Sequence, residues 1–487
     1  MSEDPDFDME VVEDDELDSY APSDSSTEAD VSTGGELEQE QPIGQERPKT
    51  QTADSGTVKL GPKELSIPSV WNITTFEEAN ESEKPIGYGV VKPGPHIENG
   101  IPLIRITDVV DGRLEVGQDF HRISDELDEQ YSRSRLDGGE LLVSIQGTVG
   151  EVVVAPSELD GANISRTLAR ITPGEGLNTY WVKYFLGSKE AQDYIEVVSS
   201  GSTRASYNIG DIRKTKLPVP PLPEQRKIAS VLQAIDQAIQ KIDEVVETLK
   251  NVLSGARKDL FENGIDGGPT KDTPMGRFPE RWELKQMGDI GKLLNGNAFP
   301  KEYQGSPYGK YPFVKVGDTN NYRKYVRGAK NYISEQELKE IGCRVQPKGT
   351  VIMPKRGAAI MTNKRRIIAQ PSIIDNNQIG VVGKSVKSSF LYNYLSTVDM
   401  GRFVQEGAVK SLTKSLISKI RVPVPEKDEQ EKIVNIIDSI EESIKLEEEK
   451  KEVYITVKRG LMQDLLTGNV RTVDKAIEVL DEVAVHG

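Results

Sequence analysis

Through the middle of the chain, apolar residues recur at alternating spacings of four and three, and charged residues fill most of the positions between them. This is the heptad pattern of a helix that packs along one apolar seam. Pro223 suits a first helical turn and Gly264 suits a stop, so the pattern predicts one helix over residues 223–264. Such a helix is roughly 60 Å long, and its seam needs a partner helix. The seam residues are Ile228, Leu232, Ile235, Ile239, Ile242, Val246, Leu249, Leu253, Ala256 and Leu260.

A second copy of this pattern lies 205 residues further along the chain, and we expect it to be the partner helix, over residues 426–468. Its seam contains Ile433, Ile437, Ile440, Ile444, Leu461 and Leu465, but the same frame puts polar residues on three seam positions, Glu447, Lys451 and Lys458. Polar seam residues weaken a coiled coil and can fix its register. Alternatively, a local stutter could bring Leu446, Val453 and Val457 onto the seam.

The segments before each helix also repeat one another. Residues 101–106, 140–145, 151–154 and 168–171 are typical of strands, residues 180–186 and 190–197 of helices, and a polar loop follows at 199–208. The second segment has matching landmarks in the same order, for example Trp282 for Trp71 and residues 311–318 for residues 101–108. Landmarks at a nearly constant offset indicate an internal duplication, with two α/β (α+β) domains, one before each helix.

Charge is distributed unevenly along the chain. Residues 1–57 hold about 18 acidic and 2 basic residues, which is typical of a disordered acidic tail. This tail accounts for nearly all of the net charge of −17. Residues 270–425 carry about 27 basic and 12 acidic residues, whereas residues 58–222 are net negative by roughly 7. The basic second segment suggests a polyanionic partner such as nucleic acid. The tail and the acidic first domain oppose DNA binding by the chain alone.

The chemistry-bearing residues are few. Cys343 is the only cysteine, which excludes an intramolecular disulfide and a cysteine-based zinc site. The three histidines are scattered, so we expect no metal site and no nucleophile–histidine pair. The sequence contains no methylase, phosphate-loop or nuclease motif that we can find, and therefore predicts neither catalytic nor cofactor-binding residues. It has no secretory signal and no membrane-spanning run, so we expect a soluble, cytoplasmic protein.

Over residues 60–470 the chain resembles the specificity subunit of type I restriction–modification systems. The resemblance rests on the doubled Pro-rich entry with Glu-Gln-(Arg/Glu)-Lys-Ile at 218–228 and 423–433, the Ser-Gly-Ser-Thr-Arg loop at 200–204, and the distal end at 458–471. It implies two target recognition domains, at 60–222 and 270–425, that each read one part of a split, asymmetric site in double-stranded DNA. Helices 223–264 and 426–468 would pair antiparallel as the spacer, followed by a C-terminal tail at 469–487.

The resemblance also implies partners. Two modification (methyltransferase) subunits, which use S-adenosylmethionine to methylate adenine, would dock on the helices. Restriction (endonuclease/translocase) subunits, which use ATP, would complete the complex, and this chain would perform no chemistry itself. Two alternatives remain open from the residues: a DNA-modifying enzyme in its own right, and a coiled-coil scaffold that binds proteins.

Candidate DNA contacts follow from side-chain chemistry, because Arg and Lys bond guanine and phosphate while Asn and Gln bond adenine. In the first domain they lie in a turn between two strands and in the polar loop: Gln146, Thr148, Ser202, Thr203, Arg204, Ser206, Tyr207 and Asn208. In the second domain they are Lys355, Arg356, Lys364, Arg365, Arg366, Lys410 and Ser411. We assign the run at 364–366 to phosphate affinity, and Trp71 and Trp282 to packing.

Overall fold

The computed structural model describes residues 55–471, apart from residues 62, 111, 118, 201–204, 274 and 405–409. Most of the predicted acidic tail and the predicted C-terminal tail beyond residue 471 therefore lie outside the described residues. The described chain divides into two compact units. The first unit contains the residues up to Glu244 together with those from Glu448 onward, and the second unit contains Val245–Glu447.

Among the described residues, the globular domain of the first unit has two larger sheets and three two-stranded ones. A four-stranded sheet has the order β10-β9-β12-β4, and a three-stranded sheet has the order β11-β5-β8, in which β11 runs parallel to β5. Strand β9 is buried on both faces, because Leu142 packs between the two sheets while Leu141 and Val143 face the helices. The strands are β1 Ser55–Leu60, β2 Lys63–Pro68, β3 Asn72–Thr75, β4 Gly87–Tyr88, β5 Ile101–Ile104, β6 Val109–Val110, β7 Arg113–Leu114, β8 His121–Ile123, β9 Leu141–Ser144, β10 Val152–Val154, β11 Asn163–Ile164, β12 Leu168–Ile171 and β13 Lys216–Val219.

Short helices connect these strands, and most begin at a capping side chain. Ser124, Asn178 and Ser188 each accept a hydrogen bond from the backbone of the first turn that follows them. The predicted helices at 180–186 and 190–197 are confirmed. The helices are α1 Phe76–Ala79, α2 Asp125–Gln130, α3 Thr179–Leu186, α4 Lys189–Ser199 and α5 Ile209–Lys214, with 3-10 turns η2 Ile106–Asp108, η3 Ser132–Ser134 and η4 Ser157–Leu159.

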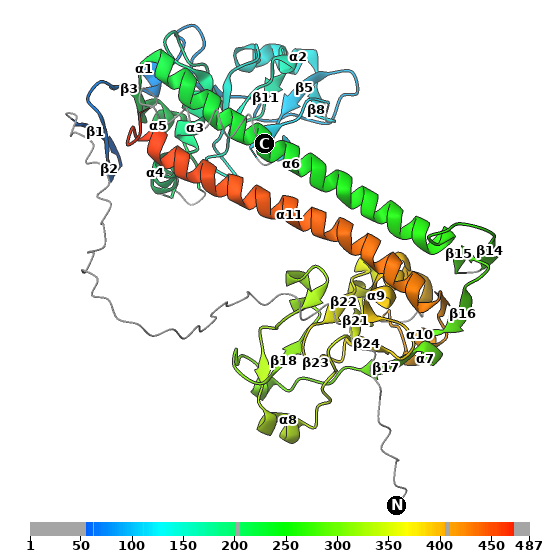
Figure 1. Cartoon of the computed structure of the whole chain (residues 1–487). Coiled ribbons are helices and arrows are strands. Elements are labelled where there is room, and N and C mark those ends of the chain that lie inside the picture. The colour runs from blue at the N-terminus through cyan, green and yellow to red at the C-terminus, as the bar shows by residue number, and fades with distance from the viewer. Residues whose placement is uncertain are drawn as a thin grey trace, which may run out of the picture. The chain divides into compact units, whose positions relative to one another are not determined.

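The second unit repeats this plan (Figure 1). A five-stranded sheet has the order β17-β24-β21-β22-β19, and a three-stranded sheet has the order β20-β18-β23, again with one parallel pair. The strands are β14 Thr270–Thr273, β15 Gly276–Pro279, β16 Glu283–Gln286, β17 Gly291–Asn295, β18 Tyr311–Val314, β19 Tyr325–Val326, β20 Tyr332–Ile333, β21 Val351–Pro354, β22 Arg366–Ile368, β23 Ile373–Ile374, β24 Gln378–Gly383 and β25 Arg421–Val424. The helices are α7 Met287–Ile290, α8 Glu335–Ile341, α9 Ser388–Thr397 and α10 Lys414–Ser418, with η5 Lys301–Tyr303, η6 Asp318–Asn321, η7 Ala358–Thr362 and η8 Met400–Phe403.

The duplication extends to close backbone packing. A Cβ atom on Gly89 would lie 1.7 Å from the carbonyl oxygen of Ile164, and one on Gly296 would lie 1.8 Å from that of Asp375. Glycine is required at both places because no side chain fits there. In each domain the strand that leads into the long helix, β13 or β25, pairs antiparallel with the strand that follows the tryptophan, β3 or β16.

The two long helices are α6 Leu222–Asn263 and α11 Lys427–Leu466. Each is followed by a glycine with positive φ, Gly264 at 69° and Gly468 at 73°, which ends the helix without steric strain. Most of the predicted seam residues are buried. None of the helices that the structure describes is long and apolar enough to cross a membrane.

Where the apolar seam of α11 is interrupted, the polar residues Lys451 and Lys458 face α6, and the apolar alternatives face solvent. Leu446, Val453 and Val457 are 55%, 60% and 43% exposed, so the proposed stutter is wrong. In the first unit Lys458 pairs with Asp236 at 2.6 Å, and Lys451 pairs with Asp243. Seven residues forward on α6 correspond to seven residues back on α11, so these segments of the two helices run in opposite directions.

Candidate nucleic-acid interface

The turn after β9 is a rigid, outward-facing element of the first domain. The Ser144 hydroxyl accepts from the Glu151 N–H at 2.8 Å and donates to the Thr148 carbonyl, which closes the turn from inside. Gly147 and Gly150 both have positive φ. The Gln192 side chain of α4 donates to the Gly150 carbonyl at 2.9 Å. These contacts leave the predicted residues Gln146 and Thr148 exposed to solvent.

Ser206 and Tyr207, at the end of the polar loop, are hydrogen-bonded to the backbone beside this turn. Gln146 and Ser206 form an antiparallel bridge, and the Tyr207 N–H donates to the Ile145 carbonyl at 3.1 Å. The structure thus brings together two candidate segments some 60 residues apart in sequence. Ser206 is half-buried and Asn208 is exposed. The predicted contacts Ser202, Thr203 and Arg204 lie outside the described residues.

Tyr207 does not belong to this surface, and its assignment as a DNA contact is wrong. Its side chain is fully buried in the domain core, and its hydroxyl lies 2.6 Å from that of Thr215. Burial raises the pKa of the Tyr207 phenol above its ordinary range. In the duplicated frame its counterpart is Leu412, which is also buried. Tyr207 therefore anchors the polar loop from below.

The second domain builds the same arrangement with different side chains. Arg356 and Ser411 form the bridge that corresponds to Gln146 and Ser206. The Leu412 N–H donates to the Lys355 carbonyl at 2.9 Å, and the Gly357 N–H donates to the Lys410 carbonyl at 2.9 Å. The turn and loop residues predicted for this domain are thus neighbours, as they are in the first.

The second surface is cationic. Arg356 and Lys410 are exposed, and Ser411 is half-buried between them. The Lys355 ammonium donates to Asn295 Oδ1 at 3.1 Å, and burial together with nearby Arg356 lowers the pKa of Lys355. An anionic ligand would relieve the mutual repulsion of these positive charges. Asn295 was not among the residues predicted for this surface. The polar stretch Asn295-Gly296-Asn297 at the end of a strand could have indicated it.

The basic run at 364–366 is only partly available to a ligand. Arg365 is 3% exposed, and its guanidinium donates to the Val398 carbonyl at 3.0 Å, so its assignment to phosphate affinity is wrong. Burial also lowers the pKa of Arg365 to about 10. The Arg366 guanidinium is half-buried and bonds the backbone carbonyls of Thr319 and Tyr322. Lys364 is partly exposed and contacts Asn320.

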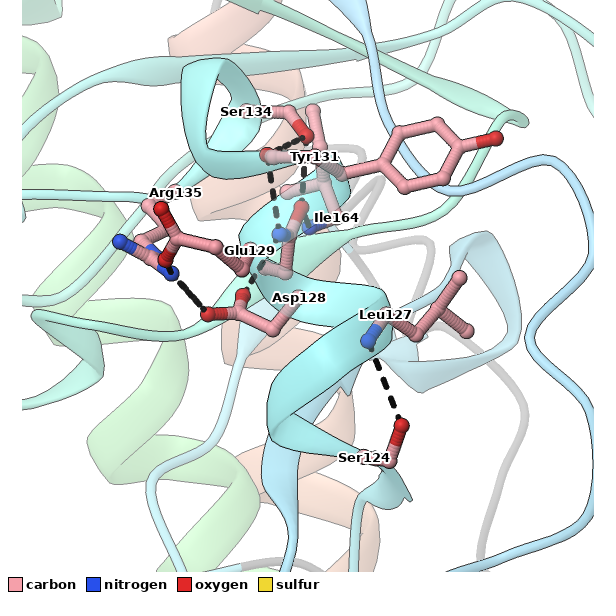
Figure 2. A network of polar contacts seen from close by, with 9 residues as sticks. Ser124, Leu127, Asp128, Glu129, Tyr131, Ser134, Arg135 and Ile164 are labelled. Atoms are coloured by element: carbon pink, nitrogen blue, oxygen red, sulfur yellow. Dashed lines mark hydrogen bonds and ion pairs between the residues drawn. The ribbon is translucent and has the colours of Figure 1, made fainter.

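A partly buried polar network lies around α2 in the first domain (Figure 2). The buried Asn163 side chain donates to Asp128 Oδ1 at 2.8 Å and accepts from the Ser134 hydroxyl at 2.7 Å. The Arg135 guanidinium pairs with Asp128 at 2.6 Å and with Glu129 at 2.5 Å. The network ties α2 and η3 to β11, and every member has a structural partner, so we assign it to stability rather than to binding.

Two of the three histidines, expected to be scattered, meet in this domain. The rings of His96 and His121 lie 5.6 Å apart, and burial and nearby Arg105 lower the pKa of His121. Among the residues that the structure describes, no three histidine, cysteine or acidic side chains come together as a metal site would require.

Comparison with known proteins agrees with this duplicated architecture. The family model described as type I restriction modification DNA specificity domain matches the chain twice, at residues 75–250 and 279–454. A putative MjaX specificity subunit of a type I restriction enzyme from Methanocaldococcus jannaschii is 24% identical over 428 residues, which cover 83% of this chain and 95% of that protein. The EcoBI specificity subunit from Escherichia coli is 29% identical over 198 residues, 40% of this chain and 41% of that protein.

A solved chain from a type I R-M system, studied for its complex assembly and conformational transition, has the same fold. Its TM-score is 0.53 at 16% identity, and the match covers 83% of this chain and 99% of the solved one. The two matches of the family model together span more than half of the sequence. The chain therefore belongs to the family of type I restriction–modification DNA specificity subunits.

Proposed function

We propose that this subunit recognises a split, asymmetric DNA sequence, with one part read by each recognition domain. The observation that carries the proposal is the repeated pairing of a turn with a polar loop, at Gln146–Ser206 and at Arg356–Ser411. The two surfaces share one backbone arrangement but present different side chains, so they would select different bases. Amide and hydroxyl groups in the first suit adenine edges, and Arg356 in the second suits guanine.

We also propose that α6 and α11 pair antiparallel as a coiled coil that sets the gap between the two half-sites. In the first unit, Asp236–Lys458 and Asp243–Lys451 support opposite helix directions. At the end of this segment, Arg471 forms a two-point ion pair with the buried Glu224 at the start of α6. In the second unit, Arg257 of α6 pairs with Glu441 of α11, which fits the same antiparallel alignment.

The outer faces of the helices suit the docking of partner subunits. Val245 and Val252 are exposed seven residues apart on α6, and Leu446, Val453 and Val457 are exposed on one face of α11. Apolar stripes of this kind are typical of protein–protein contacts. We propose that two modification subunits bind there, that restriction subunits join them, and that methylation and cleavage reside in these partners.

The test is co-expression of the chain with its modification subunit, followed by mapping of methylated adenines in the host DNA. A split motif is expected, and a swap of residues 60–222 for the equivalent domain of a relative should change one half of it only. The matched swap of residues 270–425 should change the other half. A continuous motif that neither swap alters would contradict the proposal and favour a protein-binding scaffold.

A further inference from the structure

Each recognition domain contacts a long helix near the start of that helix, at equivalent positions in the two copies. The Gln225 side chain of α6 accepts from the Asn178 N–H of the first domain at 2.9 Å. The Gln430 side chain of α11 accepts from the Lys387 N–H of the second domain at 3.3 Å. Gln225 and Gln430 are buried and are separated by the 205-residue offset of the duplication. The two domains are therefore seated on their helices by equivalent residues.

A second place of contact lies eleven residues further along each helix, at Asp236 and Glu441. Eleven residues of helix correspond to about 16 Å. In the first unit, the Tyr184 hydroxyl donates to Asp236 Oδ2 at 2.8 Å, and the Arg113 guanidinium donates to the Asp236 carbonyl at 3.2 Å. Both donors belong to the recognition domain, which is thus fixed to α6 at two separate points.

In the second unit the corresponding contact is ionic and more deeply buried. The Lys324 ammonium pairs with Asp438 at 2.5 Å and with Glu441 at 3.5 Å, and its side chain is only 9% exposed. Burial opposes the charge, but Glu441 and Asp438 outweigh it and raise the pKa of Lys324. The backbone of Lys324 belongs to the domain, because its carbonyl accepts from the Ile367 N–H at 2.8 Å.

Around the first place the domain also packs on the helices through apolar side chains, in the first unit Ile228, Leu232 and Leu465. The second place adds a contact about 16 Å away, which opposes tilting of the domain on that packing. If the second place is lost, a domain can tilt on the contacts near the helix start, which in the second unit are joined by the aromatic contact of Phe390 with Phe261 in the last turn of α6. A buried ion pair resists such a tilt, because separation of its partners leaves a charge desolvated and unpaired. A tilt would also move the exposed turn–loop surface of that domain relative to the helix axis.

We infer that the contacts at Asp236 and Glu441 hold the recognition domains at fixed angles on the helices and thereby set the separation of the two half-sites. Lys324, Tyr184 and Arg113 are then positioning residues that need not touch DNA. This inference rests on the proposed function, because it assumes a split target with a defined gap. On this inference, the number of base pairs between the half-sites depends on the domain–helix contacts at Asp236 and Glu441 as well as on the length of the helices.

The test is methylation of a DNA library in which both half-sites are kept and the gap between them varies by one or two base pairs. The reagent is the full chain in complex with its modification subunit. For Lys324→Met we expect the preference for the native gap over its neighbours to fall at least tenfold, with each half-site sequence still required. Lys324→Arg should retain the preference. Lys384→Met, which changes an exposed lysine of the same domain, is the matched control.

Should Lys324→Met fail to fold, Tyr184→Phe provides the same test in the first domain, since it removes one hydroxyl and keeps the ring. A weaker but measurable loss of gap preference is expected there. Unchanged gap preference in the soluble variants would overturn the inference, even if total methylation fell, and would leave the split-site proposal intact. A continuous motif in the unmodified complex would instead overturn the proposed function and, with it, this inference.

Discussion

Replacement of Tyr207 tests whether the polar loop of the first domain is held from below or reads DNA through its aromatic ring. Tyr207 is fully buried, and its hydroxyl contacts that of Thr215 at 2.6 Å. Tyr207→Phe removes one buried hydrogen bond, which costs about 1 kcal/mol of unfolding free energy. The Thr215 hydroxyl keeps its bond to the Asp211 carbonyl at 2.8 Å, so no buried group loses its last partner.

Tyr207→Leu copies the natural counterpart, Leu412, and removes part of the ring volume as well. We expect a total cost of about 1–3 kcal/mol from the lost bond and the smaller side chain. Urea unfolding of the full chain measures this cost. Methylation of the native motif by the assembled complex should remain within a few fold for both variants, because neither changes the exposed face of the loop.

The matched variant is Asn208→Ala, which changes an exposed neighbour in the same loop. Asn208 precedes α5, but its side chain makes no capping hydrogen bond to that helix, so the change should leave the free energy of unfolding within about 0.5 kcal/mol and weaken recognition of one half-site. The opposite pattern would refute the reasoning. If Tyr207→Phe abolished recognition without loss of stability, while Asn208→Ala had no effect, the ring of Tyr207 would have to reach DNA.

Three further predictions concern other sites. Hydrogen bonds from Arg281 and Trp282 hold the pKa of Glu429 below 4.5 despite its burial, so its stabilising effect is complete above that pH and is lost as pH falls through the lower folded pKa. Glu429→Gln should therefore flatten the acid end of the stability curve, as followed by tryptophan fluorescence. Arg356→Ala should cost about 1–3 kcal/mol in discrimination at one base pair of the second half-site only, measured by methylation of single-substitution sites. Asn163→Ala deprives a buried carboxylate of a donor and should cost about 1–3 kcal/mol in urea unfolding, where no loss would show that water replaces the amide.

Much of the scaffold could be predicted from the sequence because it depends on periodic patterns. The heptad spacing from Ile228 to Leu260 is a local property of one helix, and the structure places α6 over Leu222–Asn263. The strands at 141–144, 152–154 and 168–171 follow from runs of apolar residues between turn signals. For the long helix the duplication supplied a second copy of the pattern, 205 residues further along, against which the first could be checked.

The wrongly predicted DNA contacts belong to polar stretches of sequence that composition alone predicts to be wholly exposed. Tyr207 and Arg365 stand in hydrophilic stretches, yet both are buried, because their neighbours in space come from distant parts of the chain. Local composition carries no record of such tertiary contacts. A signal was available for Tyr207, since the duplicated frame aligns it with the apolar Leu412. For Arg365 the run of three basic residues concealed that the middle one points inward.

The pairing of Lys451 and Lys458 with acids on α6 explains why two positions of the α11 seam can be polar. The stutter was the alternative that would have restored an apolar seam, but it leaves the identity of the partner segment unspecified. A slip of one heptad would move each lysine about 10 Å from its acid. One lysine would then face the other acid, but the second ion pair would be lost, so both pairs form together in one alignment only. The polar seam positions thus sacrifice apolar burial for register.

The same exchange operates in the recognition surfaces. The described residues of the first surface, such as Gln146 and Asn208, are neutral and would gain little from attraction to phosphates, whereas Arg356 and Lys410 in the second would gain much. If both domains bound DNA through charge, either could settle on non-specific sites and the other would have little influence on the choice. On the proposed function, affinity would be concentrated in the second domain, and the first domain would add hydrogen bonds that are strong only on a matching sequence. Such a division would let one complex bind DNA and still require both halves of the proposed target.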